Sequence, residues 1–321
     1  MASKWTRAGL PLLLVCGLLT GCTVDQYARM LIEQDTTYGK INQAMVGSSE
    51  QLVASKAVSA ARRFTMADGT QIDVWVLKAA TEAPARGTVL LLHGLCDSKV
   101  TYVRLGRLLA TKGFDVVLPD LRAHGRSTGK FVTYGALEKQ DQKTVMDTLL
   151  AEKAVAEPVY AFGASMGASV AILYAAMEPR VQGVMAVAPS RDMRITCRRF
   201  LTRNAILLDD LQFDKVIAKA GQIGDFRPSE ASSLVEIARL RCPVLLVHGT
   251  LDVFVPFADS KELYDAAICP KEIELVPLAG HFGVIFAREG QIAEGMERVV
   301  SGRLKTTTQP AGETPPVTSN P

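Results

Sequence analysis

The chain has 321 residues, 48% of them apolar, which is enough to bury the core of one large α/β domain. Its formal net charge of +3 is small for this length, and no basic stripe interleaved with aromatic residues occurs. The sequence therefore disfavours a nucleic-acid partner.

The first 22 residues differ in character from the rest of the chain. Lys4 and Arg7 give a positive start, and residues 8–19 form an apolar run too short to span a bilayer, which is typical of a secretory signal. The run ends in Leu19-Thr20-Gly21-Cys22, which resembles the lipobox of bacterial lipoproteins. The resemblance implies that Cys22 is lipidated and becomes the new N-terminus. The alternative is an ordinary signal or an uncleaved anchor with a chance cysteine.

The residue after Cys22 bears on location. In Gram-negative lipoproteins an aspartate at that place usually signals retention in the inner membrane, and this chain has Thr23 instead. The resemblance therefore implies a protein of the bacterial cell envelope, lipid-anchored at the outer membrane and facing the periplasm. Several acyl chains on one cysteine would make such an anchor durable.

The two ends of the mature chain frame one folded domain. Residues 23–57 are polar with scattered apolar positions, and we interpret them as a helical tether. The folded domain described below is expected over residues 58–304. Residues 305–321 are rich in Thr, Pro and Ser without apolar periodicity, which predicts a disordered tail.

The domain begins with a hairpin and continues as a repeated strand-and-helix unit. Residues 63–80 alternate apolar and polar positions around Asp68-Gly69, which predicts an antiparallel hairpin. Continuous apolar runs follow at 88–92, 114–118, 159–162, 181–188, 244–248 and 273–278, separated by helical stretches at 103–112, 138–153, 169–177 and 260–267. Together they predict an α/β fold with a doubly wound, mostly parallel sheet covered on both faces. The longer interval at 190–241 predicts an inserted helical cap.

A five-residue motif carries the chemistry. Gly163-Ala164-Ser165-Met166-Gly167 lies between a predicted strand and a predicted helix. This is the layout of a nucleophile elbow, in which a serine takes a strained conformation that only glycine-sized neighbours tolerate.

A serine nucleophile needs a base, and the base needs an orienting carboxylate. Among the four histidines, His281 lies in a loop directly after the last predicted strand, downstream of the serine. Asp252 lies just beyond the preceding strand, so both loops are expected at the sheet edge that carries Ser165. Asp259 is a weaker rival for the orienting role. His93 and His248 end strands before glycines, where we expect structural hydrogen bonds.

Acyl transfer also needs donors for the developing oxyanion. One is the backbone N–H of Met166, which follows the nucleophile at a helix N-terminus. The second is expected in His93-Gly94-Leu95-Cys96, with the N–H of Leu95 as the best candidate.

These motifs together resemble the α/β-hydrolase superfamily, in particular its serine aminopeptidase-like and monoglyceride lipase-like branch. The resemblance covers about residues 63–303 and rests on five segments: Leu91-Leu92-His93-Gly94, residues 118–127 with Asp120, Arg122, His124 and Gly125, the elbow, His248-Gly249 with Asp252, and Gly280-His281. It implies a metal-free serine hydrolase without a cofactor, which forms a covalent acyl-enzyme on a small-molecule acyl substrate. Most relatives have glycine where this chain has Ala123, and His124 and Arg122 normally brace the loops near the nucleophile.

The spacing of the cysteines bears on two questions, metal binding and disulfide formation. No C-x-x-C pair occurs, so we expect no metal site. Cys242 and Cys269 each precede one of two neighbouring predicted strands, which makes a disulfide between them a hypothesis for an oxidising compartment.

Five arginines gather in the predicted cap, namely Arg191, Arg194, Arg198, Arg199 and Arg203. One interpretation is recognition of an anionic substrate or of phosphate headgroups. The other is a solvated helix face balanced by Asp209, Asp210 and Asp214.

The sequence as a whole favours an envelope hydrolase that cleaves carboxylic esters. Hydrolysis of amides, peptides or thioesters by the same fold is the alternative among enzymes. A non-catalytic envelope binding protein that has kept the fold is the alternative outside enzymes.

Overall fold

The computed structural model describes residues 23–33, 49–285 and 289–305. The signal segment with Cys22, and nearly all of the C-terminal tail, lie outside the described residues, so their predictions stay predictions. Within the described ranges, no helix is both long enough and apolar enough to cross a membrane.

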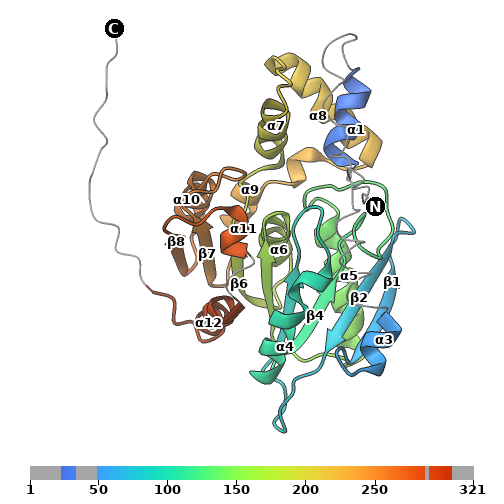
Figure 1. Ribbon diagram of the computed structural model, residues 1–321, viewed down its shortest axis with the longest axis vertical. Coiled ribbons are helices and arrows are strands. Elements are labelled where there is room, and N and C mark those ends of the chain that lie inside the picture. Colours follow the sequence, from blue (N-terminus) through green and yellow to red (C-terminus); the bar gives the residue numbers. More distant parts are fainter. Residues whose placement is uncertain (1–22, 34–48, 286–288, 306–321) are drawn as a thin grey trace, which may run out of the picture.

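Eight strands form one sheet in the order β1-β2-β4-β3-β5-β6-β7-β8 (Figure 1). The strands are β1 (Ala60–Thr65), β2 (Gln71–Leu77), β3 (Thr88–Leu92), β4 (Asp115–Pro119), β5 (Val159–Ala164), β6 (Val181–Val187), β7 (Val244–Gly249) and β8 (Lys271–Val276). Pairs β1–β2 and β2–β4 are antiparallel, and every other pair is parallel. The predicted mostly parallel α/β sheet is confirmed.

Helices cover both faces of this sheet. The helical segments of the domain are α3 (Ser49–Ala54), η1 (Lys99–Tyr102), α4 (Val103–Thr111), α5 (Glu138–Ala151), α6 (Met166–Met177), α10 (Phe257–Ala266), α11 (His281–Ile285) and α12 (Glu289–Val300). Helices α5, α6 and α10 bury residues in the core on one face, whereas α3, α4 and α12 do so on the other. The apolar run of strand β3 is continuous because both of its faces are buried. Leu90 and Leu92 face the first core, and Val89 and Leu91 face the second.

The predicted hairpin is confirmed, with one difference in its burial. Asp68 and Gly69 lie in the turn between β1 and β2, and Gly69 has φ +81°, a conformation that glycine adopts without strain. The edge strand β1 alternates partly buried and exposed residues, with Phe64 alone fully buried, but β2 is buried along almost its whole length. The reason is that β2 also pairs with β4 and is covered on both faces.

The last strand is shifted by two residues from its predicted position. Strand β8 begins at Lys271, where the sequence is still polar, because Lys271 and Glu272 continue the ladder opposite Val244 and Leu245. It ends before Leu278, which is 81% exposed and has φ 58° in the turn that leads to His281.

The segment 190–241 contains helices between β6 and β7, as predicted for a cap. They are α7 (Met193–Arg203), α8 (Asp210–Gly224), η2 (Pro228–Glu230) and α9 (Ser233–Ile237). Helix α1 (Val24–Ile32) lies beside α8 (Figure 1) and buries Ala28, Leu31 and Ile32 in a small core shared with α7 and α8. The Tyr134 hydroxyl donates a hydrogen bond of 2.6 Å to the carbonyl oxygen of Leu31, which fastens α1 to the loop before α5.

A buried ion cluster ties the first half of the sheet together. Lys99 is fully buried, its ammonium lies 2.7 Å from a carboxylate oxygen of Asp73 on β2, and it also pairs with Asp120 directly after β4. The ammonium lies 4.8 Å from the centre of the Trp75 ring, and the Lys99 amide donates to Asp120 at 2.9 Å. The cluster therefore holds the segment after β3 against the ends of β2 and β4.

Replacing Lys99 by methionine removes the cation and leaves two buried carboxylates without it. We expect Lys99→Met to lower the free energy of unfolding by about 3–5 kcal/mol, measured by urea denaturation. Lys219→Met is the matched control, because Lys219 pairs with Asp25 at 3.7 Å on the surface, where an ion pair contributes little. Equal losses in the two variants would contradict this account of the cluster.

Candidate active site

The serine motif folds as a tight turn between β5 and α6. Ser165 has φ 53° and ψ −120°, a strained conformation for a residue other than glycine. A Cβ added to Gly163 would lie 2.1 Å from the carbonyl oxygen of Gly167, and one added to Gly167 would lie 2.3 Å from that of Leu92. Both neighbours must therefore be glycine for the turn to close against β3, as the elbow motif predicts.

Three predicted residues from three distant segments meet in one hydrogen-bonded chain. The Ser165 hydroxyl lies 3.0 Å from Nε2 of His281, and Nδ1 of His281 lies 2.6 Å from a carboxylate oxygen of Asp252. Because an ionised carboxylate can only accept, Nδ1–H donates to Asp252 and Nε2 is left to accept the serine proton. This is the geometry of an activated nucleophile.

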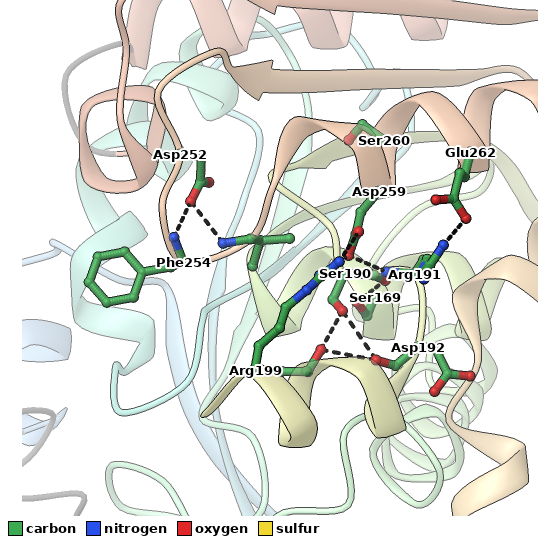
Figure 2. Close-up of polar contacts among 12 residues, drawn as sticks. Ser169, Ser190, Arg191, Asp192, Arg199, Asp252, Phe254, Asp259, Ser260 and Glu262 are labelled. Carbon is green, nitrogen blue, oxygen red and sulfur yellow. Dashed lines mark hydrogen bonds and ion pairs between the residues drawn. The ribbon is translucent and has the colours of Figure 1, made fainter. Parts of the chain in front are cut away.

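The Asp252 carboxylate is held from several sides. One oxygen accepts from the amides of Phe254 and Val255, both at 2.9 Å (Figure 2), and the other lies 3.3 Å from Nε2 of His248. Burial by itself would raise the pKa of Asp252, but the hydrogen bonds with His248, His281 and Val255 outweigh it and keep the pKa below its ordinary value. The carboxylate thus stays ionised and can stabilise an imidazolium at His281.

His248 has the structural role expected of it, and it also touches the site. It is fully buried, Nε2 donates to the carbonyl oxygen of Val255 at 2.8 Å, and Nδ1 accepts from the Ser260 hydroxyl at 2.6 Å. Its contact with Asp252 was not predicted, because the sequence places it on the strand and gives no sign of its neighbours.

Asp259, the alternative candidate for orienting His281, binds two arginines instead. Its two carboxylate oxygens accept from the Arg199 guanidinium at 2.7 and 2.8 Å, and the Arg191 amide lies 3.2 Å from it (Figure 2). Among the two candidates, only Asp252 reaches His281.

The loop after β3 lies against the nucleophile. A Cβ on Gly94 would lie 3.4 Å from the Cβ of Ser165. Nε2 of His93 accepts from the Leu121 amide at 2.9 Å, and Nε2 of His124 accepts from the Cys96 amide at 3.2 Å. Burial lowers the pKa of both histidines, which keeps them neutral and able to accept. The expected bracing roles of His93 and His124 are confirmed.

The two predicted oxyanion donors lie beside the serine. Leu95 and Met166 both line the space around Ser165, and neither amide donates a hydrogen bond within the described ranges. Ala123, where relatives have glycine, has φ 60° and so adopts the left-handed conformation that glycine would adopt more easily.

Two cavities flank Ser165. The larger has a volume of about 460 Å³ and is lined by Gly94, Leu95, Cys96, Asp97, Tyr102, Ala164, Ser165, His281, Phe282 and Ile285. The smaller, about 60 Å³, lies between the serine and the cap and includes Ser169, Met193 and Val255. The aromatic rings of Phe254 and Phe282 lie 5.6 and 5.5 Å from the His281 ring. Of the lining residues, sequence reasoning missed Asp97, Tyr102, Phe282 and Ile285, because they belong to no motif.

The cap arginines are all paired, mostly with carboxylates. Arg194 pairs with Asp214 and Arg198 with Asp210, whereas Arg191 reaches Glu262 on α10 (Figure 2). Arg199 pairs with Asp259, as described above, and Arg203 donates to the carbonyl oxygen of Val253, next to Asp252. This agrees with the second interpretation, ion pairs on a helix face. In addition, three of the arginines fasten α7 and the segment just before it to α10 and to the Asp252 loop.

The hypothetical disulfide is not formed in this structure. Cys242 and Cys269 are free thiols, although both belong to one apolar cluster at the start of β7 and β8. Burial raises the pKa of Cys242 to about 12, so it stays a protonated, apolar packing residue. In the described part of the chain, no group of three or more His, Cys, Asp or Glu side chains is placed to hold a metal ion.

Comparisons with known proteins agree with this architecture. Residues 83–219 match the family model described as serine aminopeptidase, S33. The uncharacterized protein YqkD of Bacillus subtilis is 26% identical over 201 residues, 60% of this chain and 64% of YqkD, so the match spans a little under two thirds of that relative. A monoacylglycerol lipase of Mycolicibacterium smegmatis is 24% identical over 245 residues, 67% of this chain and 85% of the lipase.

Among solved structures, an esterase of Pyrococcus furiosus superposes with a TM-score of 0.61 at 23% identity, covering 78% of this chain and 93% of the esterase. At this identity the likeness concerns the fold, and it shows that the sheet, its helices and their order are those of the α/β-hydrolase fold.

The two acids can be separated by experiment. We expect Asp252→Asn to slow covalent labelling of Ser165 by an organophosphorus probe by about 10⁴-fold, because His281 loses its orienting partner and correct tautomer. Asp259→Asn should slow labelling far less, because its contacts are with Arg199 and Arg191. Circular dichroism would first verify that both variants are folded. A larger loss in Asp259→Asn than in Asp252→Asn would reverse the assignment.

Proposed function

We propose that this chain, which has the α/β-hydrolase fold, is a serine hydrolase that cleaves carboxylic esters through a covalent acyl-enzyme. The observation that carries the proposal is the chain of hydrogen bonds from Ser165 through His281 to Asp252. Ser165 lies in a strained turn and is hydrogen-bonded to a histidine that a buried carboxylate orients. This arrangement suits a nucleophile that attacks an electrophile and has few purely structural roles.

The proposed reaction uses each of these residues in turn. Nε2 of His281 takes the Ser165 proton as Oγ attacks the ester carbonyl, and Asp252 stabilises the resulting imidazolium. The amides of Leu95 and Met166 are the donors for the oxyanion. His281 then passes the proton to the leaving alcohol, and it later activates the water that releases the acid and regenerates Ser165.

Esters are favoured over other acyl compounds by the larger cavity and by two of the relatives. Most of the residues that line the cavity are apolar, which suits an uncharged acyl or alkyl group. The names of the lipase and the esterase point to ester cleavage by those proteins. The family description points to aminopeptidases, so amide or peptide cleavage is the second candidate, with thioester cleavage beside it.

We also propose that the enzyme is lipid-anchored at Cys22 in the bacterial cell envelope, at the outer membrane. The support is the lipobox-like segment together with the position of Thr23, which caps α1 through reciprocal hydrogen bonds with Gln26. Because α1 packs on α8, an anchor at Cys22 would hold the cap close to the membrane.

Ester hydrolysis by Ser165 is tested with matched substrates. We expect the wild-type protein to hydrolyse a short p-nitrophenyl ester faster than the corresponding anilide and thioester, and Ser165→Ala to lower kcat by about 10⁶-fold. Faster anilide or thioester cleavage would replace the ester assignment within the same mechanism. Full activity in Ser165→Ala would refute the mechanism. No activity and no labelling of the wild type would favour a non-catalytic binding protein.

Lipidation is tested in cells that express the full chain. We expect metabolic labelling with a palmitate analogue and recovery in the outer-membrane fraction, and we expect Cys22→Ser to lose both. Cys16→Ser is the matched control, because Cys16 lies inside the apolar run and should leave labelling unchanged. Unlabelled wild-type protein would contradict the anchor and leave the hydrolase proposal untouched.

A further inference from the structure

The two cavities beside Ser165 differ in which parts of the site they contact. Ser165 and His281 line the larger cavity, whereas Ser165, Leu95 and Met166 line the smaller one. In the described part of the chain, His281 does not line the smaller cavity, and Met166 does not line the larger one. The base therefore borders only the larger cavity, and both proposed oxyanion donors border the smaller one.

This difference gives each cavity one side of the ester. In the proposed reaction, Nε2 of His281 must reach the leaving oxygen to pass it a proton, so the alcohol group has to lie on the side of His281. The carbonyl oxygen is held by the amides of Leu95 and Met166, and the acyl chain extends away from the leaving group. The larger cavity thus suits the alcohol group, and the smaller one is left for the acyl chain.

The smaller cavity offers little space. Its volume is about 60 Å³, compared with about 460 Å³ for the larger cavity. A water-sized group needs about 10–15 Å³ of such a cavity, so the smaller one holds about four to six non-hydrogen atoms. Acetyl and butyryl chains fit this space, whereas an octanoyl chain exceeds it.

Hydrogen bonds hold two walls of the smaller cavity in place. The Tyr134 hydroxyl donates to the carbonyl oxygen of Leu31 on α1 at 2.6 Å, and the Ser169 hydroxyl donates to that of Ser190 at 3.1 Å. Tyr134, Ser169 and Ser190 all line the cavity. Because the hydroxyls of Tyr134 and Ser169 already have partners, this part of the wall does not need a polar substrate group.

The cap supplies the remaining wall from two of its segments. Met193 and Thr196 on α7 line the cavity together with Ala231, which lies between η2 and α9. The Met193 amide donates to the carbonyl oxygen of Ala231 at 3.0 Å, and the Thr196 hydroxyl donates to that of Asp192 at 3.0 Å. Met193 and Ala231 are buried in the small core of the cap. A longer cavity would therefore require packed side chains to move.

We propose that the smaller cavity is an acyl subsite that restricts the enzyme to short acyl chains, while the larger cavity accepts a longer alcohol group. Met193 sets the limit, because it has the largest side chain among the cap residues that line the cavity. A longer acyl chain would overpack this wall, which costs free energy. This proposal rests on the proposed function and narrows it to esters of short acids with longer alcohols.

Two isomeric esters test the assignment in the unchanged protein. Octyl acetate and ethyl octanoate have the same composition and differ only in which side of the ester carries the long chain. We expect the wild type to hydrolyse octyl acetate with a kcat/KM higher by about tenfold or more, as for a pocket that cannot accept extra methylenes. Acid release in a pH-stat measures both rates. Equal rates, or faster cleavage of ethyl octanoate, would overturn the assignment.

Shortening Met193 should relax the limit. We expect Met193→Ala to raise kcat/KM for ethyl octanoate relative to octyl acetate by about tenfold. Leu201→Ala is the matched control, because Leu201 is buried on the same helix and in the same small core but lines neither cavity. Its ratio should equal that of the wild type. The same change in both variants, or no change in a folded Met193→Ala protein, would contradict the role of Met193.

Other acyl compounds keep this test separate from the ester assignment. The acyl chain lies in the same place whichever bond is cleaved, so we expect acetyl to be preferred to octanoyl among anilides and thioesters too. The same preference together with faster anilide or thioester cleavage would support the subsite and refute the ester assignment. Ester cleavage without an acyl limit would refute the subsite and leave the proposed function intact. No cleavage in any series would refute the proposed function, and the subsite with it.

Discussion

The arrangement of the site depends on the close approach of three backbone segments at Ser165. Gly163 tolerates no Cβ because it would clash with Gly167, and Gly167 tolerates none because it would clash with the carbonyl oxygen of Leu92 at the end of β3. The turn therefore fixes β5, α6 and the loop after β3 relative to one another through these two contacts. The Ser165 amide donates to Val187 on β6 at 2.8 Å, which extends the constraint to the next strand. The strained serine is held in place because its whole surroundings are rigid.

A second close approach of the backbone brings Asp252 and His281 to Ser165. A Cβ on Gly249 would lie 2.2 Å from the carbonyl oxygen of Ala279, and the Leu251 amide donates to that oxygen at 2.9 Å. The loops that carry Asp252 and His281 are thus fastened to each other before they reach Ser165. The cap adds to this support, because Arg203 on α7 donates to the carbonyl oxygen of Val253. Among the cap arginines, Arg203 thus acts on the position of the loop that carries Asp252.

The sequence predicts the elements that depend on local pattern and misses those that depend on distant neighbours. The strand runs, the Asp68-Gly69 turn and the elbow glycines each impose their structure through residues close in the chain, so they could be recognised. Three features could not be recognised: the start of β8 at Lys271, the contact of His248 with Asp252 and the free thiol of Cys242. Each of them follows from packing between segments that are far apart in the sequence. Asp97 and Tyr102 were missed as cavity-lining residues for the same reason.

The central claim is that an acyl group passes through Ser165, and trapping that intermediate tests it most directly. The full-length protein would be mixed briefly with an activated ester, quenched in acid, digested and examined by mass spectrometry. We expect the acyl mass on the peptide that contains Ser165, and no such mass in Ser165→Ala. Hydrolysis accompanied by acylation elsewhere, for example at Cys96 in the same cavity, or by no acylation at all, would contradict the account.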